Sequence, residues 1–381
     1  SSDESGFGIT WVLACLAGAF VTVSILIGIV GFFVVNSENN NENMHINEPS
    51  EPGSHNSRNA QDSATSSVKS VVVCYWNSSS LLRRPPRDYD LNKLCVHCCT
   101  HLVYLGASID PRTLRLSFQE DDTGLKSVRD MDALKTSHPL LRLVVSLRLS
   151  GLLPELRNVT EGPEAALARA TLAQNVARWL PEYNFDGVEV DWDRLPQELK
   201  PVYVDLVKAL HTVTKKMRLQ ILVSVHPKWG PSYDVEALYS LSDLLILHPY
   251  SKEDSPKMAL PPVLFKEDLV ETCEVFLGHL QSRRRVVLAL PLFGFAYRLR
   301  SSGRYELRSP VRGPAPPGPY TDSRGLLAYF EICLEFSSDL WVSLYDKEAD
   351  CKIAVNRDKS QWIGYDNKAT ILNKVSLRIS F

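Results

Sequence analysis

The chain begins with a long apolar stretch and continues with a long polar one. Residues 9–35 contain no Asp, Glu, Lys or Arg. A helix of this length rises about 40 Å, more than the roughly 30 Å hydrocarbon core of a bilayer. The stretch therefore predicts one transmembrane helix over 9–35, because the apolar region of a signal peptide is usually only about 7–15 residues long. We expect residues 1–8 to be a cytoplasmic tail. Residues 36–69 predict a disordered stalk, because they hold too few large apolar side chains to offset the entropy of ordering.

From residue 70 onwards, short apolar runs alternate with stretches that have helical periodicity. Helices are expected over Pro163–Leu180 and Leu199–Lys216, where apolar residues recur at three- and four-residue spacing. The runs expected as strands are rich in β-branched residues and cover Val71–Trp76, His101–Ile109, Leu141–Leu147, Phe185–Asp191, Leu219–Val225, Leu244–Leu247 and Arg285–Leu292. This alternation predicts an α/β fold with a parallel sheet, and periodicity leaves a doubly wound sheet and a (β/α)8 barrel equally open. Residues of about 298–367 break the rhythm and are expected to be an insertion.

Charge and cysteine content narrow the class of protein. The 42 basic and 44 acidic residues give a net charge of -2, so no nucleic-acid partner is expected. Seven of the eight cysteines follow the stalk, and Asn77 and Asn158 begin glycosylation sequons. These features predict a single-pass type II membrane protein whose carboxy-terminal domain is extracellular or lumenal. A metal cluster could be formed by Cys95, Cys98 and Cys99 with His97 and His101, but a matching second ligand pair is missing, so we expect disulfides, no metal and no cofactor.

The segment with the clearest chemistry runs from Phe185 to Asp193. Its acids Glu189, Asp191 and Asp193 alternate with apolar residues, so on a strand the three carboxylates share one face. Crowded carboxylates raise one another's pKa, and this keeps a carboxylic acid protonated for general-acid catalysis. A solvated edge strand is the simpler alternative.

This segment resembles the D-G-x-D-x-D-x-E signature of glycoside hydrolase family 18, which contains chitinases and chitinase-like lectins. Further similar motifs follow in the family's order and cover residues 71 to about 374. They are Cys74-Tyr75-Trp76, Cys99 to Tyr104, Leu290 to Gly294, Gly313 to Gly318, Ala328 to Cys333 and Gln361 to Asp366. The resemblance implies that residues 70–381 form a TIM (β/α)8-type barrel, with a small α+β insertion after the seventh strand and a sugar groove at the carboxyl ends of the strands. It also implies disulfides Cys74–Cys99 and Cys333–Cys351, with Cys95, Cys98 and Cys273 left over.

Family members of this kind hydrolyse by substrate assistance. The last acid protonates the glycosidic oxygen, while the preceding Asp and a Tyr of the sixth strand stabilise the oxazolinium that forms from the substrate's N-acetyl group. Matched by position, Asp193 is the acid, Asp191 the orienting residue and Glu189 the second family Asp, while Tyr250 is the Tyr. The resemblance thus implies that ligand contacts Tyr75, Asp191, Asp193 and Tyr250.

Several positions depart from the family pattern. Asp193 replaces Glu and withdraws the carboxyl by roughly 1–1.5 Å, which can cost about a hundredfold in rate. Ser251 replaces the family's sixth-strand Asp, Arg148 and Leu149 replace two glycines, and Ser79 replaces a stacking aromatic residue. We therefore expect no catalytic residue and no hydrolysis.

The end of the chain departs from the family as well. Where the family continues to an eighth strand, this chain ends at Phe381, so that strand is expected to be missing or replaced. The tail alternates apolar and polar residues from Val375 and could act as a strand. An incomplete chain is the preferred interpretation.

Taken together, the sequence predicts a membrane-anchored, non-catalytic chitinase-like protein. Its expected partner is a chitin-like or N-acetylglucosamine-containing carbohydrate, or an extracellular glycoprotein. Two alternatives stay open, namely a weak endo-acting chitinase with Asp193 as general acid, and an adhesion protein without sugar binding.

Overall fold

The structure is a computed structural model, and it describes residues 32–33, 70–83, 88–118, 121–150, 156–250, 256–260, 266–301, 303–336, 339–356, 358 and 360–376. The predicted tail and stalk lie outside these residues, as does the predicted membrane helix except for Phe32 and Phe33. Those two residues form the short strand β1 (Phe32–Phe33), so at these positions the structure differs from the predicted helix. Among the described residues, no helix has the length and apolar character needed to cross a bilayer.

The larger part of the chain folds around a curled parallel sheet of seven strands. The strands follow one another in the order β10-β9-β8-β7-β6-β3-β2, so each new strand pairs beside the previous one. Their bounds are β2 Val73–Trp76, β3 His101–Tyr104, β6 Arg142–Arg148, β7 Gly187–Asp191, β8 Gln220–Val225, β9 Leu244–Leu247 and β10 Val286–Leu288. Each of the seven predicted runs therefore contains a strand of this sheet, but His101–Ile109 and Arg285–Leu292 are each divided into two strands. A doubly wound sheet would reverse its order at the centre, so the unbroken order selects the barrel alternative.

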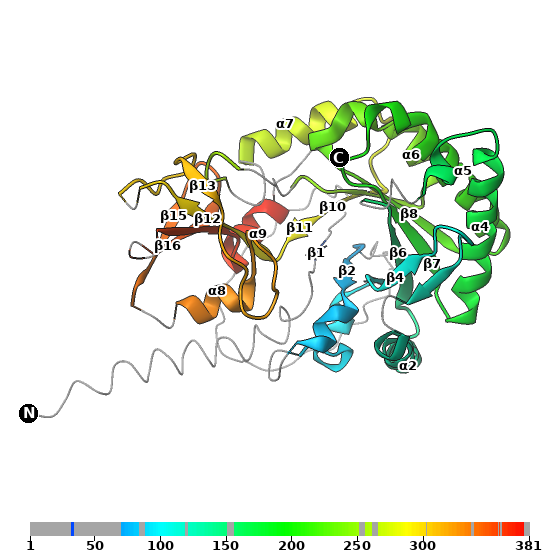
Figure 1. Ribbon diagram of the computed structural model, residues 1–381, viewed down its shortest axis with the longest axis horizontal. Coiled ribbons are helices and arrows are strands. Elements are labelled where there is room, and N and C mark those ends of the chain that lie inside the picture. Colours follow the sequence, from blue (N-terminus) through cyan, green and yellow to red (C-terminus); the bar gives the residue numbers. More distant parts are fainter. Residues whose placement is uncertain are drawn as a thin grey trace, which may run out of the picture.

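Helices cover the outer face of this sheet, as Figure 1 shows. They are α2 Asp121–Ser137, α3 Arg157–Thr160, α4 Ala165–Glu182, α5 Lys200–Lys216, α6 Val235–Leu241 and α7 Lys266–Leu277. The predicted helices correspond to α4 and α5. In α4 the buried residues Leu172, Val176 and Leu180 recur at four-residue spacing, and they lie in the same core as Val188 and Val190 of β7.

The parallel sheet has two edges, β2 and β10, in the part of the chain that the structure describes. The two-residue strand β11 (Leu290–Pro291) follows β10 and pairs antiparallel with β1, which also contacts β2. In Figure 1 β1 lies between β2 and β11. Exposed backbone groups at strand edges favour such pairing. This short pair stands where a closed barrel would have its eighth strand.

A second sheet, antiparallel and six-stranded, follows the barrel strands. Its strands are β12 Phe293–Leu299, β13 Val311–Pro314, β14 Leu326–Ala328, β15 Trp341–Asp346, β16 Cys351–Asn356 and β17 Gln361–Tyr365. Alternate side chains of β12, β16 and β17 enter two separate cores, one on each face of the sheet. The helix α8 (Tyr329–Glu335) covers one face through Ile332. A separate hairpin joins β4 (Ala107–Ile109) to β5 (Leu116–Phe118).

One predicted disulfide is confirmed and one is wrong. Cys74 of β2 and Cys99 are bonded, with Cα atoms 5.9 Å apart. Cys95 and Cys98, which the resemblance left over, are bonded to each other.

Cys333 and Cys351 are not bonded to each other. Cys351 is buried with Ile353 in the core on one face of the second sheet. Cys333 is exposed on α8, which covers the opposite face. The alternation of side chains along β16 thus explains why the predicted bond does not form.

The tail of the chain is helical where it is described. The helix α9 (Lys368–Val375) ends at Val375, so this residue closes a helix instead of opening the expected strand. Residues 377–381, the rest of the predicted strand, lie outside the described residues.

Candidate functional site

The three acids of the signature lie at the carboxyl end of β7, as the alternation predicts. Glu189 and Asp191 point to one side of the strand, while Val188 and Val190 are fully buried on the other. Asp193 follows the strand and keeps 31% of its side chain exposed, against 1% for the residue Glu189. The ladder therefore runs from the barrel interior to its mouth.

The innermost acid is held by side chains from neighbouring strands. The hydroxyl of Tyr75, on β2, donates a hydrogen bond to Glu189 Oε1. Ser224 Oγ, on β8, donates to the same oxygen over 2.7 Å. Tyr75 is only 2% exposed, so it contacts Glu189 from within the barrel interior. Its predicted contact with ligand stays a prediction.

His248, which immediately follows β9, extends this hydrogen-bond network to Tyr250. Its Nε2 lies 3.0 Å from Ser224 Oγ, and its Nδ1 lies 2.6 Å from the Tyr250 hydroxyl. Because Ser224 gives its one proton to Glu189, its oxygen accepts from His248 Nε2–H. A neutral imidazole then has Nδ1 as its acceptor, so Tyr250 donates its proton to His248.

A second histidine, His226, lies between the two outer acids. It directly follows β8, and its Nε2 is 2.8 Å from Asp191 Oδ1. Its Nδ1 is 3.6 Å from Asp193 Oδ1. Among the described residues these last two atoms are buried and have no hydrogen-bond partner. The ring stacks on His248, with centroids 4.8 Å apart and planes inclined by 15°.

Burial and these contacts separate the charge states of the two histidines. Burial disfavours the charged form of His226, but its hydrogen bond and charge interaction with Asp191 outweigh this effect and raise its pKa. Burial and the positive charge of His226 lower the pKa of His248 to about 3. Burial also opposes ionisation of Asp191, yet the hydrogen bond and charge of His226 prevail and lower the pKa of Asp191. These shifts favour an imidazolium at His226 beside a carboxylate at Asp191, with a neutral imidazole at His248 stacked on it.

The carboxyl whose pKa is raised is the innermost one. Burial and the nearby charge of Asp191 raise the pKa of Glu189 to about 7. The sequence predicted that crowding raises the pKa of one acid; at Glu189 burial is the larger cause of the rise and the charge of Asp191 the second. A group that is 1% exposed has little access to a glycosidic oxygen, so this proton is poorly placed for general-acid catalysis.

The mouth of the site carries the substitutions that depart from the family pattern. Arg148 ends β6 in register with Asp191, and Arg194 Nε lies 3.8 Å from Asp193 Oδ2. Leu149 is buried, whereas Ser79 is exposed. Ser251 lies outside the described residues. Basic groups thus stand beside both outer carboxylates.

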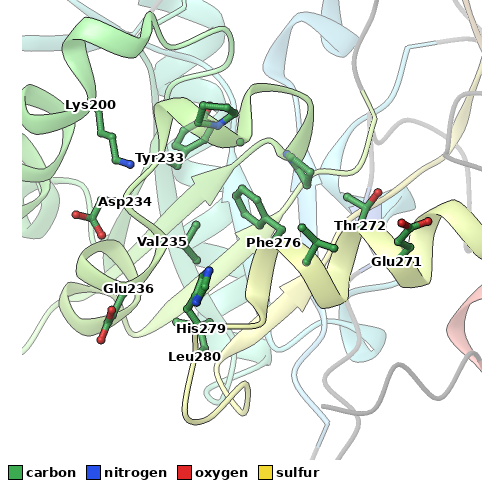
Figure 2. A pocket seen from close by; sticks show the side chains of 14 residues that line it. Lys200, Tyr233, Asp234, Val235, Glu236, Glu271, Thr272, Phe276, His279 and Leu280 are labelled. Atoms are coloured by element: carbon green, nitrogen blue, oxygen red, sulfur yellow. The ribbon is translucent and has the colours of Figure 1, made fainter.

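A pocket of about 660 Å³ lies next to this site but is lined by other residues (Figure 2). Its walls come from the turn of 3₁₀ helix η5 (Pro227–Ser232), from α6 and from α7, and include Tyr233, Glu236, Phe276 and His279. Tyr233 links the two regions, because its hydroxyl donates to the carbonyl of Trp192, the residue before Asp193. None of the signature acids lines this pocket, so we identify the site by the ladder.

The sequons and the cysteine cluster differ in burial, because Asn158 is exposed, Asn77 and Cys98 are half-buried and Cys95 is buried. Asn77 caps the 3₁₀ helix η1 (Ser78–Leu82) and accepts from the Ser79 amide, and Asn158 is exposed on α3. Their glycosylation stays a prediction. The ligand atoms of Cys95, His97 and Cys98 lie within 4.8 Å of one another, but the two thiols are bonded together in the structure.

Sequence reasoning missed His226 and the roles of His248 and Ser224. A usable signal existed for His226, because it directly follows a predicted strand and functional residues of barrels gather at carboxyl ends of strands. Its partner Asp191 lies on the adjacent strand, and only the pairing of β7 with β8 brings the two together.

Comparison with known proteins agrees with the geometry. Chitinase-3-like protein 2 of Homo sapiens is 24% identical over 330 residues, covering 80% of this chain and 82% of the relative. Chitotriosidase-1 of Mus musculus is also 24% identical and covers 78% and 67% of the two chains.

Solved structures share the fold. A group IV chitinase of Ostrinia furnacalis in complex with allosamidin superposes with a TM-score of 0.70 at 22% identity, covering 80% of this chain and 87% of that one. Human YKL-39, described as a pseudo-chitinase with retained chitooligosaccharide binding properties, superposes with a TM-score of 0.68 at 23% identity and the same coverage. The model of glycosyl hydrolases family 18 matches residues 71–378, and the chain therefore belongs to that family.

Proposed function

We propose that this protein binds chitin-like or N-acetylglucosamine-containing carbohydrate, or a glycoprotein that carries it, without cleaving it. The observation that carries the proposal is the occupant of the acid position. By the family resemblance, Asp193 stands there in place of Glu, Glu189 stands in place of an Asp, and Asp191 and Tyr250 match the family's residues. A site that retains its scaffold and loses the reach of its acid is suited to binding. The existence of YKL-39, a family member described as a pseudo-chitinase that retains chitooligosaccharide binding, supports the same reading.

The proposal also includes the cellular location of the domain and its attachment to a membrane. We place it outside the cell or in a lumen, attached by a single membrane helix within residues 9–31, before β1. The charge-free stretch and the sequons at Asn77 and Asn158 support this placement.

A weak endo-acting chitinase is the second candidate. It is favoured by the retained ladder, in which Asp193 is the most exposed of the acids. This candidate predicts that Asp193→Asn abolishes turnover and that Asp193→Glu increases it.

One assay separates these readings. The full chain is incubated with a fluorogenic chitobioside, beside Asp193→Asn and Asp193→Glu as matched variants. The proposal expects no product above the blank for the wild type, and appreciable turnover would refute it. Binding is measured separately by calorimetric titration with the β-1,4-linked tetramer of N-acetylglucosamine. Saturable heat is expected, and its absence together with preserved cell binding would favour an adhesion role.

A further inference from the structure

The two histidines of the site engage the two groups that would otherwise face a ligand's N-acetyl substituent. An acetamido group offers one N–H donor and one carbonyl acceptor, so it needs an acceptor and a donor from the protein. Asp191 and Tyr250 have the matching chemistry. Asp191 is held by His226, which follows the adjacent strand β8. Tyr250 is held by His248, which lies two residues before it.

The hydroxyl proton of Tyr250 is already used in a hydrogen bond to His248 Nδ1. The chain of bonds from Tyr250 through His248 and Ser224 to Glu189 runs in one direction, since each member donates to the next. Reversing it would need a proton on His248 Nδ1 and would leave Glu189 without the donor at Ser224. The hydroxyl that could meet an acetamido carbonyl therefore points at His248.

Asp191 is held in place by its ion pair with His226. Its Oδ1 accepts from His226 Nε2 at 2.8 Å, and that imidazole is only 7% exposed and stacked on His248. Rotating Asp191 towards a ligand would break a charge-assisted hydrogen bond and leave the imidazolium buried without it.

We propose that His226 and His248 are positioning residues that hold Asp191 and Tyr250 within the protein's own hydrogen-bond network, so that a bound glycan is recognised through its hydroxyl groups and not through its N-acetyl group. The proposal rests on the proposed function for the class of ligand. It adds a specificity: the site accepts β-1,4-linked glucose-type oligosaccharides whether or not they carry acetamido groups. Asp193, at the mouth, accepts hydrogen bonds from hydroxyls.

The test compares two ligands that differ in the acetamido group. The full chain is titrated calorimetrically with the tetramer of N-acetylglucosamine and with cellotetraose. For the wild type we expect dissociation constants within about threefold of each other. For the double variant His226→Ala/His248→Met we expect at least a tenfold gain in preference for the acetylated tetramer, because a hydrogen bond to a charged group becomes available. His138→Ala, after α2 and away from the ladder, should leave the ratio unchanged.

Two results would overturn the proposal. One is a wild type that already prefers the acetylated tetramer by more than tenfold, and the other is a folded double variant with an unchanged ratio. If the wild type binds neither tetramer, the proposed function fails. The hydrogen-bond network is then still tested by NMR of ¹⁵N-histidine-labelled protein at pH 7. We expect two protonated nitrogens on His226 and a proton only on Nε2 of His248, and a proton on Nδ1 of His248 would refute the assignment.

Discussion

Replacing His226 by glutamine removes the positive charge beside Asp191 and retains a side chain that can donate a hydrogen bond. The two charges are 2.8 Å apart, and their side chains are 7% and 19% exposed. At an effective dielectric constant of about 20 their attraction is about 6 kcal/mol. Desolvation of both ions cancels much of this gain. We therefore expect the variant to lose about 1.5–3 kcal/mol in free energy of unfolding, the range for a hydrogen bond that involves a charged group.

The directions of the two pKa shifts determine how this loss of stability changes with pH. The pKa of His226 is raised above its usual 6.5 in the folded protein. Its stabilising effect is therefore complete below about pH 6.5 and is lost as the pH rises through the folded value. The pKa of Asp191 is lowered, so its contribution is complete above its usual 3.8 and is lost as the pH falls through its folded value.

The assay is urea unfolding followed by tryptophan fluorescence at pH 5.5 and at pH 9, with His138→Gln as control. The difference between wild type and His226→Gln should shrink from pH 5.5 to pH 9. An equal difference at both pH values would show that His226 stabilises the fold by packing alone, and the charge argument would then be refuted.

Three further predictions concern other parts of the structure and are tested by thermal and chemical unfolding. Lys374→Met breaks a fully buried ion pair with Asp366 and should cost about 3–5 kcal/mol, whereas adding Asp366→Leu should recover part of the loss; no recovery would contradict this account. Burial lowers the pKa of His101 to about 4, so the wild type should lose stability as the pH falls from 6.5 to 4, and His101→Gln should flatten that dependence. In Gly187→Ala the new Cβ would lie 2.5 Å from the backbone oxygen of Gln220, so a loss of about 1–3 kcal/mol is expected, and unchanged stability would mean that β8 moves freely.

Much of the fold could be predicted because each strand can be recognised from its own local sequence pattern. A buried parallel strand such as β9 is a continuous apolar run, and helices such as α4 show helical spacing. The barrel order could not be read from these patterns, since every strand of a parallel sheet looks alike in sequence. It followed from the family resemblance, and the pairing of the strands confirms it.

The candidate site was predictable only along one strand. Alternation places Glu189 and Asp191 on one face, and the structure confirms this. The contact of Asp191 with His226 depends on the pairing of β7 with β8, and an isolated histidine after an apolar strand gives no local sign of it. The wrong Cys333–Cys351 bond has the same origin, because the two faces of the second sheet are defined by long-range pairing.

The two histidines and the shortened acid affect different properties of the site. A ladder of carboxylates is costly to bury unless each has a partner. His226 neutralises Asp191, and His248 completes the chain that ends on Glu189, so both stabilise the barrel interior. An active enzyme would keep such groups available for its substrate, at a cost in stability. Asp193 takes part in this network only through its charge, which helps to raise the pKa of His226: its Oδ1 and the Nδ1 of His226, 3.6 Å apart, have no hydrogen-bond partner among the described residues. Asp193 keeps 31% of its side chain exposed, so ligand recognition should be concentrated at this carboxylate, which accepts hydrogen bonds from hydroxyl groups.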